Sequence, residues 1–246
     1  MSIAMQDYTH IAREITVTLF AAQSLASAAF IASGTVNAIV GAELSGNPAW
    51  AGVPSGVVQL GAAIAALIVG AIMGRVGRRA GLTLGLATGV LGAGLAVVAM
   101  QARSFPLFLG GLAGLGVARA AMQLGRFAAA EVHPPDQRGR AISYVVIGGT
   151  VGSVVGPQLV GPTGQWALGV EMNELAGPYV ATLIVLALAA LAILKWLRPD
   201  PRDVGRVVSE MYHESGPRQV ATRSISRSCA VRARSWRLQR WWSAKR

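Results

Sequence analysis

Residues 55–100 read SGVVQLGAAIAALIVGAIMGRVGRRAGLTLGLATGVLGAGLAVVAM, and this stretch decides the fold class. Residues 55–73 and residues 80–100 contain no charged side chain, and three arginines lie between them. A helix of about 20 apolar residues is long enough to cross the hydrocarbon core of a bilayer. The stretch therefore predicts two membrane-spanning helices joined by a short basic turn.

Four further apolar segments continue this pattern along the chain. They cover residues 15–41, 105–124, 141–161 and 178–194. The chain is 53% hydrophobic and 13% charged, whereas a soluble domain carries about a quarter charged residues. Runs this continuously apolar do not fit the alternating pattern of a membrane barrel. We predict an all-α, polytopic membrane protein with six transmembrane helices in one bundle.

The basic residues of the short loops predict the orientation, because Arg and Lys are retained on the cytoplasmic side during insertion. The loops expected on that side contain Arg75, Arg78, Arg79, Arg126, Arg138, Arg140, Lys195, Arg198, Arg202 and Arg206. The loops after the first and fifth segments contain only acidic charges, Glu43, Glu171 and Glu174. We therefore expect both termini in the cytoplasm of a multi-pass protein of the cell membrane, plasma or inner, without a cleaved signal peptide.

The chain divides by composition into a bundle (residues 1–197), a cytoplasmic linker (198–215) and a basic tail (216–246). The tail holds nine basic residues and no acid, and it supplies most of the net charge of +11. A charge confined to a tail does not indicate a nucleic-acid partner. One hypothesis is a shifted reading frame near Gly216 that replaces a second half; the other is a genuine segment, expected to be disordered, that binds anionic lipid through its cations and tryptophans.

Two glycine patterns predict close helix packing, because small residues four apart let helix backbones approach. The first, in the third segment, is Gly81, Gly85 and Gly89. The second, in the fifth segment, is Gly148, Gly152 and Gly156, followed by Pro157 and Gly161. Because proline removes a backbone donor, we expect a flexing point in the fifth helix.

The turn GAIMGRVGRRAG between the second and third segments has two sets of residues to explain. Its arginines, Arg75, Arg78 and Arg79, fit a cytoplasmic anchor. Its glycines, Gly70, Gly74 and Gly77, fit a tight reversal between packed helices.

This turn resembles the major facilitator loop signature G-x-L-A-D-R-x-G-R-R, and the fifth segment resembles the G-x-x-x-G-P antiporter signature of the same superfamily. Gly114 and Gly116 fit a third, weaker signature. The resemblance covers residues 15–210 and implies a secondary transporter that works by alternating access, here small-molecule efflux by antiport. Gly74 stands where the family has an acid, and Gly110 where it has an arginine.

The family has two six-helix halves, and this chain resembles the amino-terminal one. The resemblance thus implies a truncated chain whose partner is either a missing carboxy-terminal half or a second copy. The alternative is a non-transporting fragment that acts as a membrane interaction or scaffold protein.

Polar residues inside the predicted spans are candidates for substrate binding, because such groups are costly in lipid. They are Gln23, Asn37, Gln59, Arg119 and Gln123. The resemblance implies that helices 1, 2, 4 and 5 line the cavity. Hydrogen bonding between helices explains the amides equally well, and Arg119 could instead extend to the membrane surface.

The sequence does not favour an enzyme or a cofactor. Its one cysteine, Cys229, and its three histidines all lie outside the predicted spans. No nucleophile with a base and no metal-ligand cluster is recognisable. We expect no catalytic site, metal or cofactor.

Overall fold

The computed structural model describes residues 2–206 and 208, with side chains from residue 10 onward. Six long helices form the described part of the chain. They are α1 (Ser2–Ser45), α2 (Val53–Val76), α3 (Arg78–Gln101), α4 (Phe105–Glu131), α5 (Arg138–Gly169) and α6 (Gly177–Trp196). Short 3-10 turns, η1 (Pro48–Trp50) and η2 (Glu174–Ala176), precede α2 and α6. All six helices are long and apolar enough to cross a membrane, which confirms the predicted fold class.

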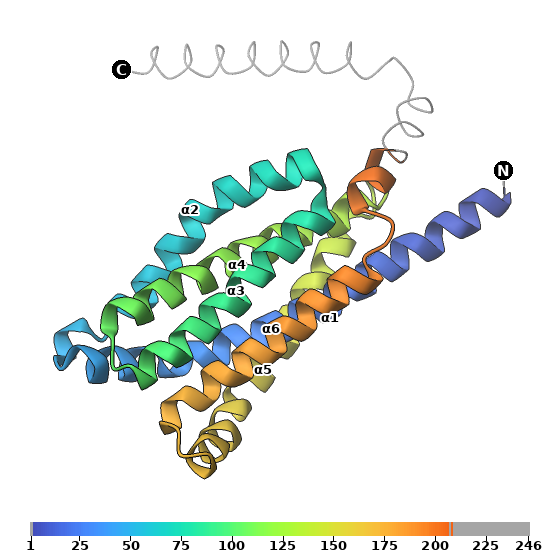
Figure 1. Cartoon of the computed structure of the whole chain (residues 1–246). Helices are drawn as coiled ribbons and strands as arrows, with labels where there is room; N and C mark the ends of the chain where they lie inside the picture. The colour runs from blue at the N-terminus through green and yellow to red at the C-terminus, as the bar shows by residue number, and fades with distance from the viewer. Residues whose placement is uncertain (1, 207, 209–246) are drawn as a thin grey trace, which may run out of the picture. The chain divides into compact units, whose positions relative to one another are not determined.

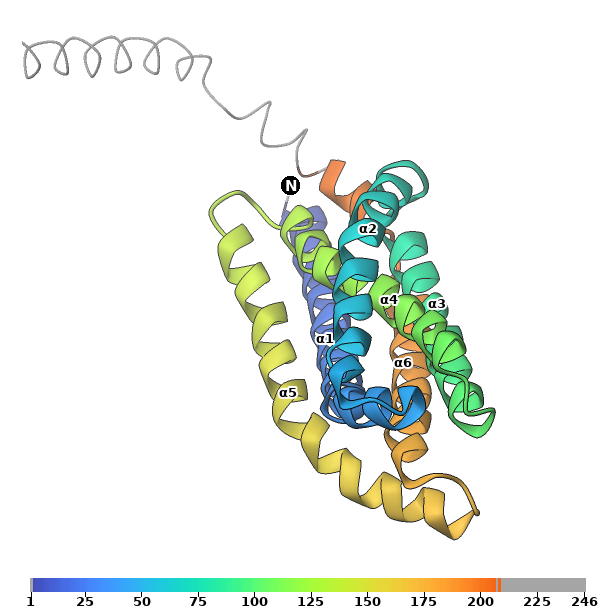
Figure 2. The same ribbon diagram turned by 90° about the vertical axis from the view of Figure 1, so that its left-hand side faces the viewer.

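The helices extend beyond the apolar segments that predicted them, and the predicted boundaries were wrong mainly in α1, α4 and α5. The fourth helix continues from Leu124 to Glu131, and the fifth passes through Pro157 and Pro162 to Gly169. Hydropathy detects only the part of a helix that lies in hydrocarbon, whereas backbone hydrogen bonding continues into the polar interface. The α5 ribbon changes direction in its carboxy-terminal half (Figure 2). Flexing at that bend stays a prediction.

Helices α1 and α4 are the centre of the arrangement. Helix α1 packs mainly against α5 and α6, whereas α4 packs mainly against α2 and α3, and α3 also contacts α6 (Figure 1). The core between them consists largely of alanines and glycines, while large aliphatic side chains such as Leu67 and Leu91 lie on the outside. This distribution suits a lipid environment, where packing of small residues, not removal of apolar surface from water, holds helices together.

Close backbone contacts explain the glycines of α3 and α4. A Cβ added at Gly92 would meet backbone atoms of α4, and one at Gly116 would lie 2.6 Å from the carbonyl oxygen of Val58 in α2. In the predicted motif of α3, Gly85 and Gly89 face the side chains of Ala121 and Ala118. Helix α4 therefore uses one face for α3 and another for α2, and both faces need small residues.

The loops alternate between the two ends of the bundle. The amino terminus of α1, the α2–α3 turn, the α4–α5 loop and the end of α6 lie at one end, and the other three connections lie at the opposite end (Figure 2). The predicted cytoplasmic arginines thus gather at one end. At the other end, Asn173 donates a hydrogen bond to Glu43 (3.2 Å). Which end faces the cytoplasm stays a prediction from the positive charges.

The first part of the predicted linker packs against the bundle, and residues 201–206 form a helical turn. A Cβ at Gly205 would lie 3.0 Å from the carbonyl oxygen of Glu131. The rest of that linker after Val208, and the whole predicted basic tail, lie outside the described residues. The two hypotheses for the tail stay open.

Candidate functional site

A polar cleft of about 330 Å³ lies between α1, α4 and α5, and we call it the α1–α4–α5 cleft. Its lining residues are Gln23, Ser27, Met122, Gln123, Arg126, Val145, Val146, Gly149, Thr150 and Ser153. Amide, hydroxyl and guanidinium groups from three helices therefore converge on one space. Such a set can hydrogen-bond a polar solute without help from the loops.

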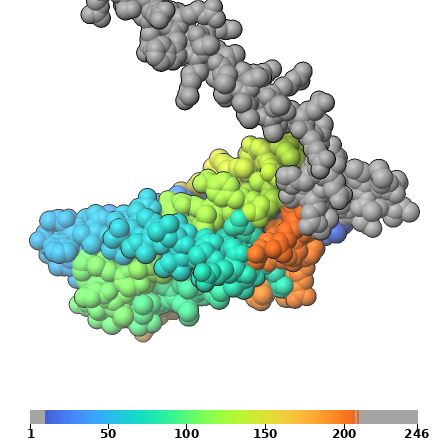
Figure 3. All heavy atoms as spheres, turned by 90° about the horizontal axis from the view of Figure 1, so that it is seen from above, coloured from blue at the N-terminus to red at the C-terminus, as the bar shows by residue number. Residues whose placement is uncertain are grey.

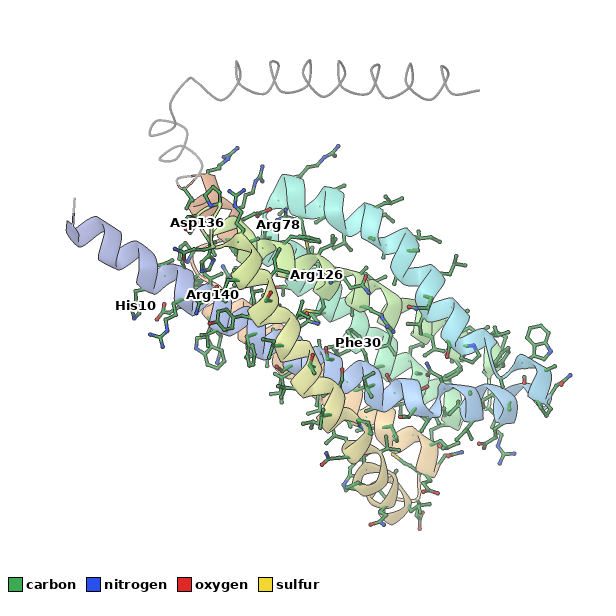
Figure 4. The ribbon with its side chains drawn as sticks, turned by 180° about the vertical axis from the view of Figure 1, so that it is seen from behind. His10, Phe30, Arg78, Arg126, Asp136 and Arg140 are labelled. Carbon is green, nitrogen blue, oxygen red and sulfur yellow. The ribbon has the colours of Figure 1, made fainter. Side chains whose placement is uncertain are left out.

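Arg126 and Gln23 are the two lining residues that have a buried side-chain atom without a hydrogen-bond partner among the described residues. The Nε atom of Arg126 is buried and has no hydrogen-bond partner among the described residues, and the same holds for the Oε1 atom of Gln23. Gln23 donates through Nε2 to the hydroxyl of Ser27 (3.3 Å). The guanidinium of Arg126, labelled in Figure 4, lies 5.4 Å from the ring centroid of Phe127. Both residues thus line the cleft, and each has one buried polar atom without a partner among the described residues.

The glycine series of α5 fixes the position of this cleft. A Cβ at Gly148 would lie 2.7 Å from the carbonyl oxygen of Phe20, and one at Gly156 would lie 2.8 Å from that of Ala28. At Gly152 it would overlap the carbonyl oxygen of Ser24. Three successive turns of α5 therefore rest on the backbone of α1. Because of this register, Thr150 and Ser153 lie on the flank of α5 that borders the cleft.

Two of the five predicted substrate residues, Gln23 and Gln123, line the cleft. Arg119 lies one turn before Gln123 on the same face of α4, since the two are four residues apart. Arg119 is partly buried and makes no ion pair among the described side chains. It does not belong to the lining of the cleft.

Asn37 and Gln59 lie elsewhere. Asn37 is buried and accepts a hydrogen bond from the hydroxyl of Tyr179, whose ring packs edge-on against Phe108 at a centroid distance of 5.6 Å. Asn37 therefore connects α1 to α6. Gln59 is exposed on α2. The structure brings neither residue to the cleft.

Arg126 is the residue that sequence reasoning assigned to a loop. Hydropathy ended the fourth segment at Leu124, so Arg126 was counted among the basic residues of a cytoplasmic loop. The placement in a loop was wrong, because α4 continues to Glu131 and includes Arg126, whereas a position on the cytoplasmic side stays a prediction. The spacing offered a signal: positions 119, 123 and 126 share one face of a helix.

The α2–α3 turn forms a second group of polar residues at the end of the bundle. Gly77 has a φ of 116°, and a Cβ there would overlap the carboxylate of Asp200. That carboxylate accepts hydrogen bonds from the backbone N–H groups of Arg78 (3.1 Å) and Arg79 (3.2 Å), at the start of α3. An anion at a helix amino terminus is stabilised by the helix dipole. Asp200 thus holds the turn against the chain that leaves α6.

Two arginines of this turn, Arg78 and Arg79, have side-chain partners within the bundle. Arg78 pairs with Glu131 at the end of α4, with an Nε to Oε2 distance of 3.0 Å. Arg79 donates to the carbonyl oxygen of Leu194 (2.6 Å), and Arg202 donates to that of Arg75 (3.0 Å). In Figure 3 the end of α6 and the chain after it lie directly against the α2–α3 turn. The turn is therefore held from two sides.

Gly70 and Gly74, in contrast, lie inside α2. A Cβ at Gly74 would meet nothing within 4 Å, and one at Gly70 would meet only a side-chain atom of Leu124 at 3.9 Å. The expectation that all three glycines serve the reversal was therefore wrong for these two, because α2 continues to Val76. Of these three glycines, only Gly77 has a conformation that requires glycine. In the fifth-helix motif, Pro157 and Gly161 are exposed, and a Cβ at Gly161 would likewise meet nothing.

The profile of the Major Facilitator Superfamily matches residues 19–241, which is most of the chain. The chain belongs to this superfamily of membrane transporters, as the resemblance of its turn and fifth helix predicted. Its six apolar helices fit the amino-terminal half of the fold.

Two relatives illustrate how much of such a transporter is present. The chain is 35% identical over 195 residues to the MFS-type transporter YdeG of Bacillus subtilis strain 168, covering 79% of this chain and 45% of the relative. It is 32% identical over 215 residues to the riboflavin transporter RfnT of Brucella anthropi, covering 84% of this chain and 53% of the relative. The chain thus spans about half the length of the curated relatives it matches.

Proposed function

We propose that this chain is the amino-terminal half of a secondary transporter and that the α1–α4–α5 cleft forms one wall of its solute path. The observation that supports this most strongly is the pair of unused groups, Arg126 Nε and Gln23 Oε1, in a polar cleft of a membrane bundle. A charged group in a membrane is costly and usually faces a water-filled cavity or a partner. A position beside a solute path would explain why both polar groups lie within the bundle.

The chemistry of the cleft favours a solute with an anionic or strongly accepting group. A guanidinium hydrogen bond to an anion is about twice as strong as a neutral one. The acceptor on Gln23 and the hydroxyls of Thr150 and Ser153 would receive or donate further hydrogen bonds at the same solute. Arg119 and Gln123, on the same face of α4 as Arg126, extend this surface along the helix. Asn37 and Gln59 remain candidates for other parts of the path.

Alternating access requires a second bundle, since one half rocks against the other around the bound solute. We propose that this bundle is a carboxy-terminal half or a second copy of the chain. The arginine-bearing end would face the cytoplasm of a cell-membrane protein. Export by antiport is proposed from the resemblance of Gly152, Gly156 and Pro157 to the antiporter signature.

The competing function is a membrane fragment that does not transport. It is the expected behaviour of a single bundle, because one bundle alone offers one wall of a path. The two functions differ in solute flux, which can be measured directly.

The test joins residues 1–208 to the carboxy-terminal half of the Brucella riboflavin transporter and measures riboflavin exchange in liposomes, beside the 246-residue chain alone. Flux in the hybrid is expected. Arg126→Gln should lower it about 10-fold or more, because a hydrogen bond to a charged group contributes about 1.5–3 kcal/mol. Arg206→Gln, an exposed arginine outside the cleft, is the matched control and should leave flux unchanged.

A folded hybrid without exchange of riboflavin or of a panel of organic anions would favour the non-transporting fragment. An equal loss of flux in the two arginine variants would show that the cleft is not part of the solute path. The proposal that the chain belongs to a transporter would still stand. Flux from the chain alone would identify a second copy as the missing bundle.

A further inference from the structure

A second cleft, of about 460 Å³, lies where α1, α5 and the α4–α5 loop meet, and we call it the α1–α5 end cleft. Its lining residues are Ala12, Arg13, Thr16, Val17, Phe20, His133, Pro134, Gln137 and Tyr144. It lies at the arginine-bearing end of the bundle. Figure 4 shows Arg140, near the start of α5, beside this part of α1.

The end cleft is separate from the proposed solute path. On α5, Val146, Thr150 and Ser153 border the first cleft, whereas Tyr144 borders the second. At 100° per residue, Tyr144 points well over 90° away from those three, on the other side of the ridge that contacts α1. The two clefts therefore open on different flanks of α5.

One wall of the end cleft is cationic and rich in donors. Arg13 lines it, and the neighbouring acid Glu14 instead lies 3.6 Å from His10 Nδ1. Arg140 is not part of the lining, but its guanidinium lies 5.7 Å from the ring centroid of the lining residue Tyr144. The acid of the loop, Asp136, is exposed and is not part of the lining.

The start of α5 adds a second source of positive potential. Gln137, which lines the cleft, is the N-cap of α5, and its side chain makes no capping hydrogen bond. The first turn contains no acid that would offset the helix dipole. The backbone N–H groups of Gln137 and Arg138 donate to the carbonyl oxygen of Pro134 (2.9 and 3.2 Å), so those of Gly139 and Arg140 are the ones without a backbone partner among the described residues. Such groups at a helix start, next to a cation, favour a phosphate.

The other wall is apolar. Val17 and Phe20 follow Arg13 along α1 toward the middle of the bundle, and Tyr144 closes the cleft on α5. Tyrosine is enriched at the level of lipid headgroups, where its ring meets hydrocarbon and its hydroxyl meets water. A ligand that fills this cleft must therefore be polar at one end and apolar at the other.

We propose that the end cleft binds an anionic phospholipid, with its phosphate between Arg13 and the start of α5. The first acyl carbons lie along Val17 and Phe20, and Arg140 attracts the headgroup. A free phosphate would use the cationic wall but leave the apolar wall exposed. Basic pockets between membrane helices on the cytoplasmic side are known to select anionic headgroups.

The test uses the purified 246-residue chain in detergent and native mass spectrometry with added lipid. Phosphatidylglycerol is expected to stay bound at least 5-fold more than phosphatidylcholine of the same acyl chains. The double variant Arg13→Gln/Arg140→Gln should lose that preference, whereas Arg13→Lys/Arg140→Lys should keep most of it. Arg206→Gln is the control for loss of an exposed cation at the same end of the bundle.

Circular dichroism confirms that each variant is folded, and the lysine variant keeps the test valid if the glutamine variant is unstable. No preference for phosphatidylglycerol in the parent, or an equal loss in Arg206→Gln, overturns the site. Displacement of phosphatidylglycerol by millimolar inorganic phosphate would overturn the lipid assignment in favour of a soluble anion. None of these outcomes depends on solute transport.

Discussion

At the scale of single residues, the turn between α2 and α3 shows how one glycine can be needed where its neighbours are not. Gly77 combines a φ of 116° with direct contact to the Asp200 carboxylate. Gly74, three residues earlier, is helical and has free space around it. The sequence presents both as members of one motif, and only their surroundings separate them.

Gly77→Ala is therefore expected to destabilise the protein by about 1–3 kcal/mol, the cost of a strained backbone conformation, with the overlap on Asp200 as a further penalty. Gly74→Ala should be neutral or stabilising by up to about 1 kcal/mol, since alanine is the better helix former. Apparent unfolding temperatures in detergent, measured at one scan rate, compare the pair. Similar temperatures for the two variants would show that the Asp200 contact does not constrain the turn.

Asn37 and Arg126 show that the role of a polar residue also depends on surroundings that the sequence does not reveal. Both are polar groups in an apolar helix, and sequence reasoning chose the first and assigned the second to a loop. Asn37 has a partner in Tyr179, whereas Arg126 Nε has none among the described residues. A partner on a helix distant in sequence cannot be read from local composition, so the distinction required coordinates.

At the scale of elements, the α1–α5 contact depends on three glycines that fit the backbone of α1. Spacing alone predicted close packing, because glycines four apart lie on one face of a helix. It did not identify the partner helix. The structure assigns it to α1, whose carbonyl groups at Phe20, Ser24 and Ala28 follow the same four-residue step.

Gly152→Ala is expected to separate α1 from α5 and to lower stability by about 2 kcal/mol or more, because its methyl group has no room beside Ser24. Gly161→Ala on the same helix, where the added Cβ meets nothing, is the matched control. Apparent unfolding temperature and sensitivity to added protease report the difference. Equal behaviour of the two variants would contradict the tight contact.

Helix ends were the least predictable feature of the elements. The hydrocarbon core requires apolar residues, so hydropathy located the middle of each span. Beyond the core, a helix continues as long as its backbone groups are satisfied, and polar residues such as Arg126 and Glu131 do not stop it. This is why α4 and α5 were predicted too short.

At the scale of the whole molecule, the alternation of loops leads to a prediction about the two ends of the bundle. In a variant whose native Cys229 is replaced by serine, Asp136→Cys should react with a membrane-impermeant maleimide only after cells are permeabilised. Ala49→Cys, in the turn before α2, should react in intact cells. Both positions are exposed in the structure, so reactivity reports the side of the membrane. The reverse pattern would contradict the cytoplasmic assignment of the arginine-bearing end.

The sequence by itself determined that residues 2–206 form six apolar helices long enough to cross the membrane, and that the chain has the turn and fifth-helix signatures of its superfamily. It could do so because lipid requires long apolar helices, and such segments are visible residue by residue. Only the tertiary structure decided which polar groups meet in the α1–α4–α5 cleft and which form hydrogen bonds between helices instead. It also decided where the α1–α5 end cleft lies. Those results depend on the rotation of each helix about its axis and on contacts between residues far apart in sequence, which packing determines and local composition does not record.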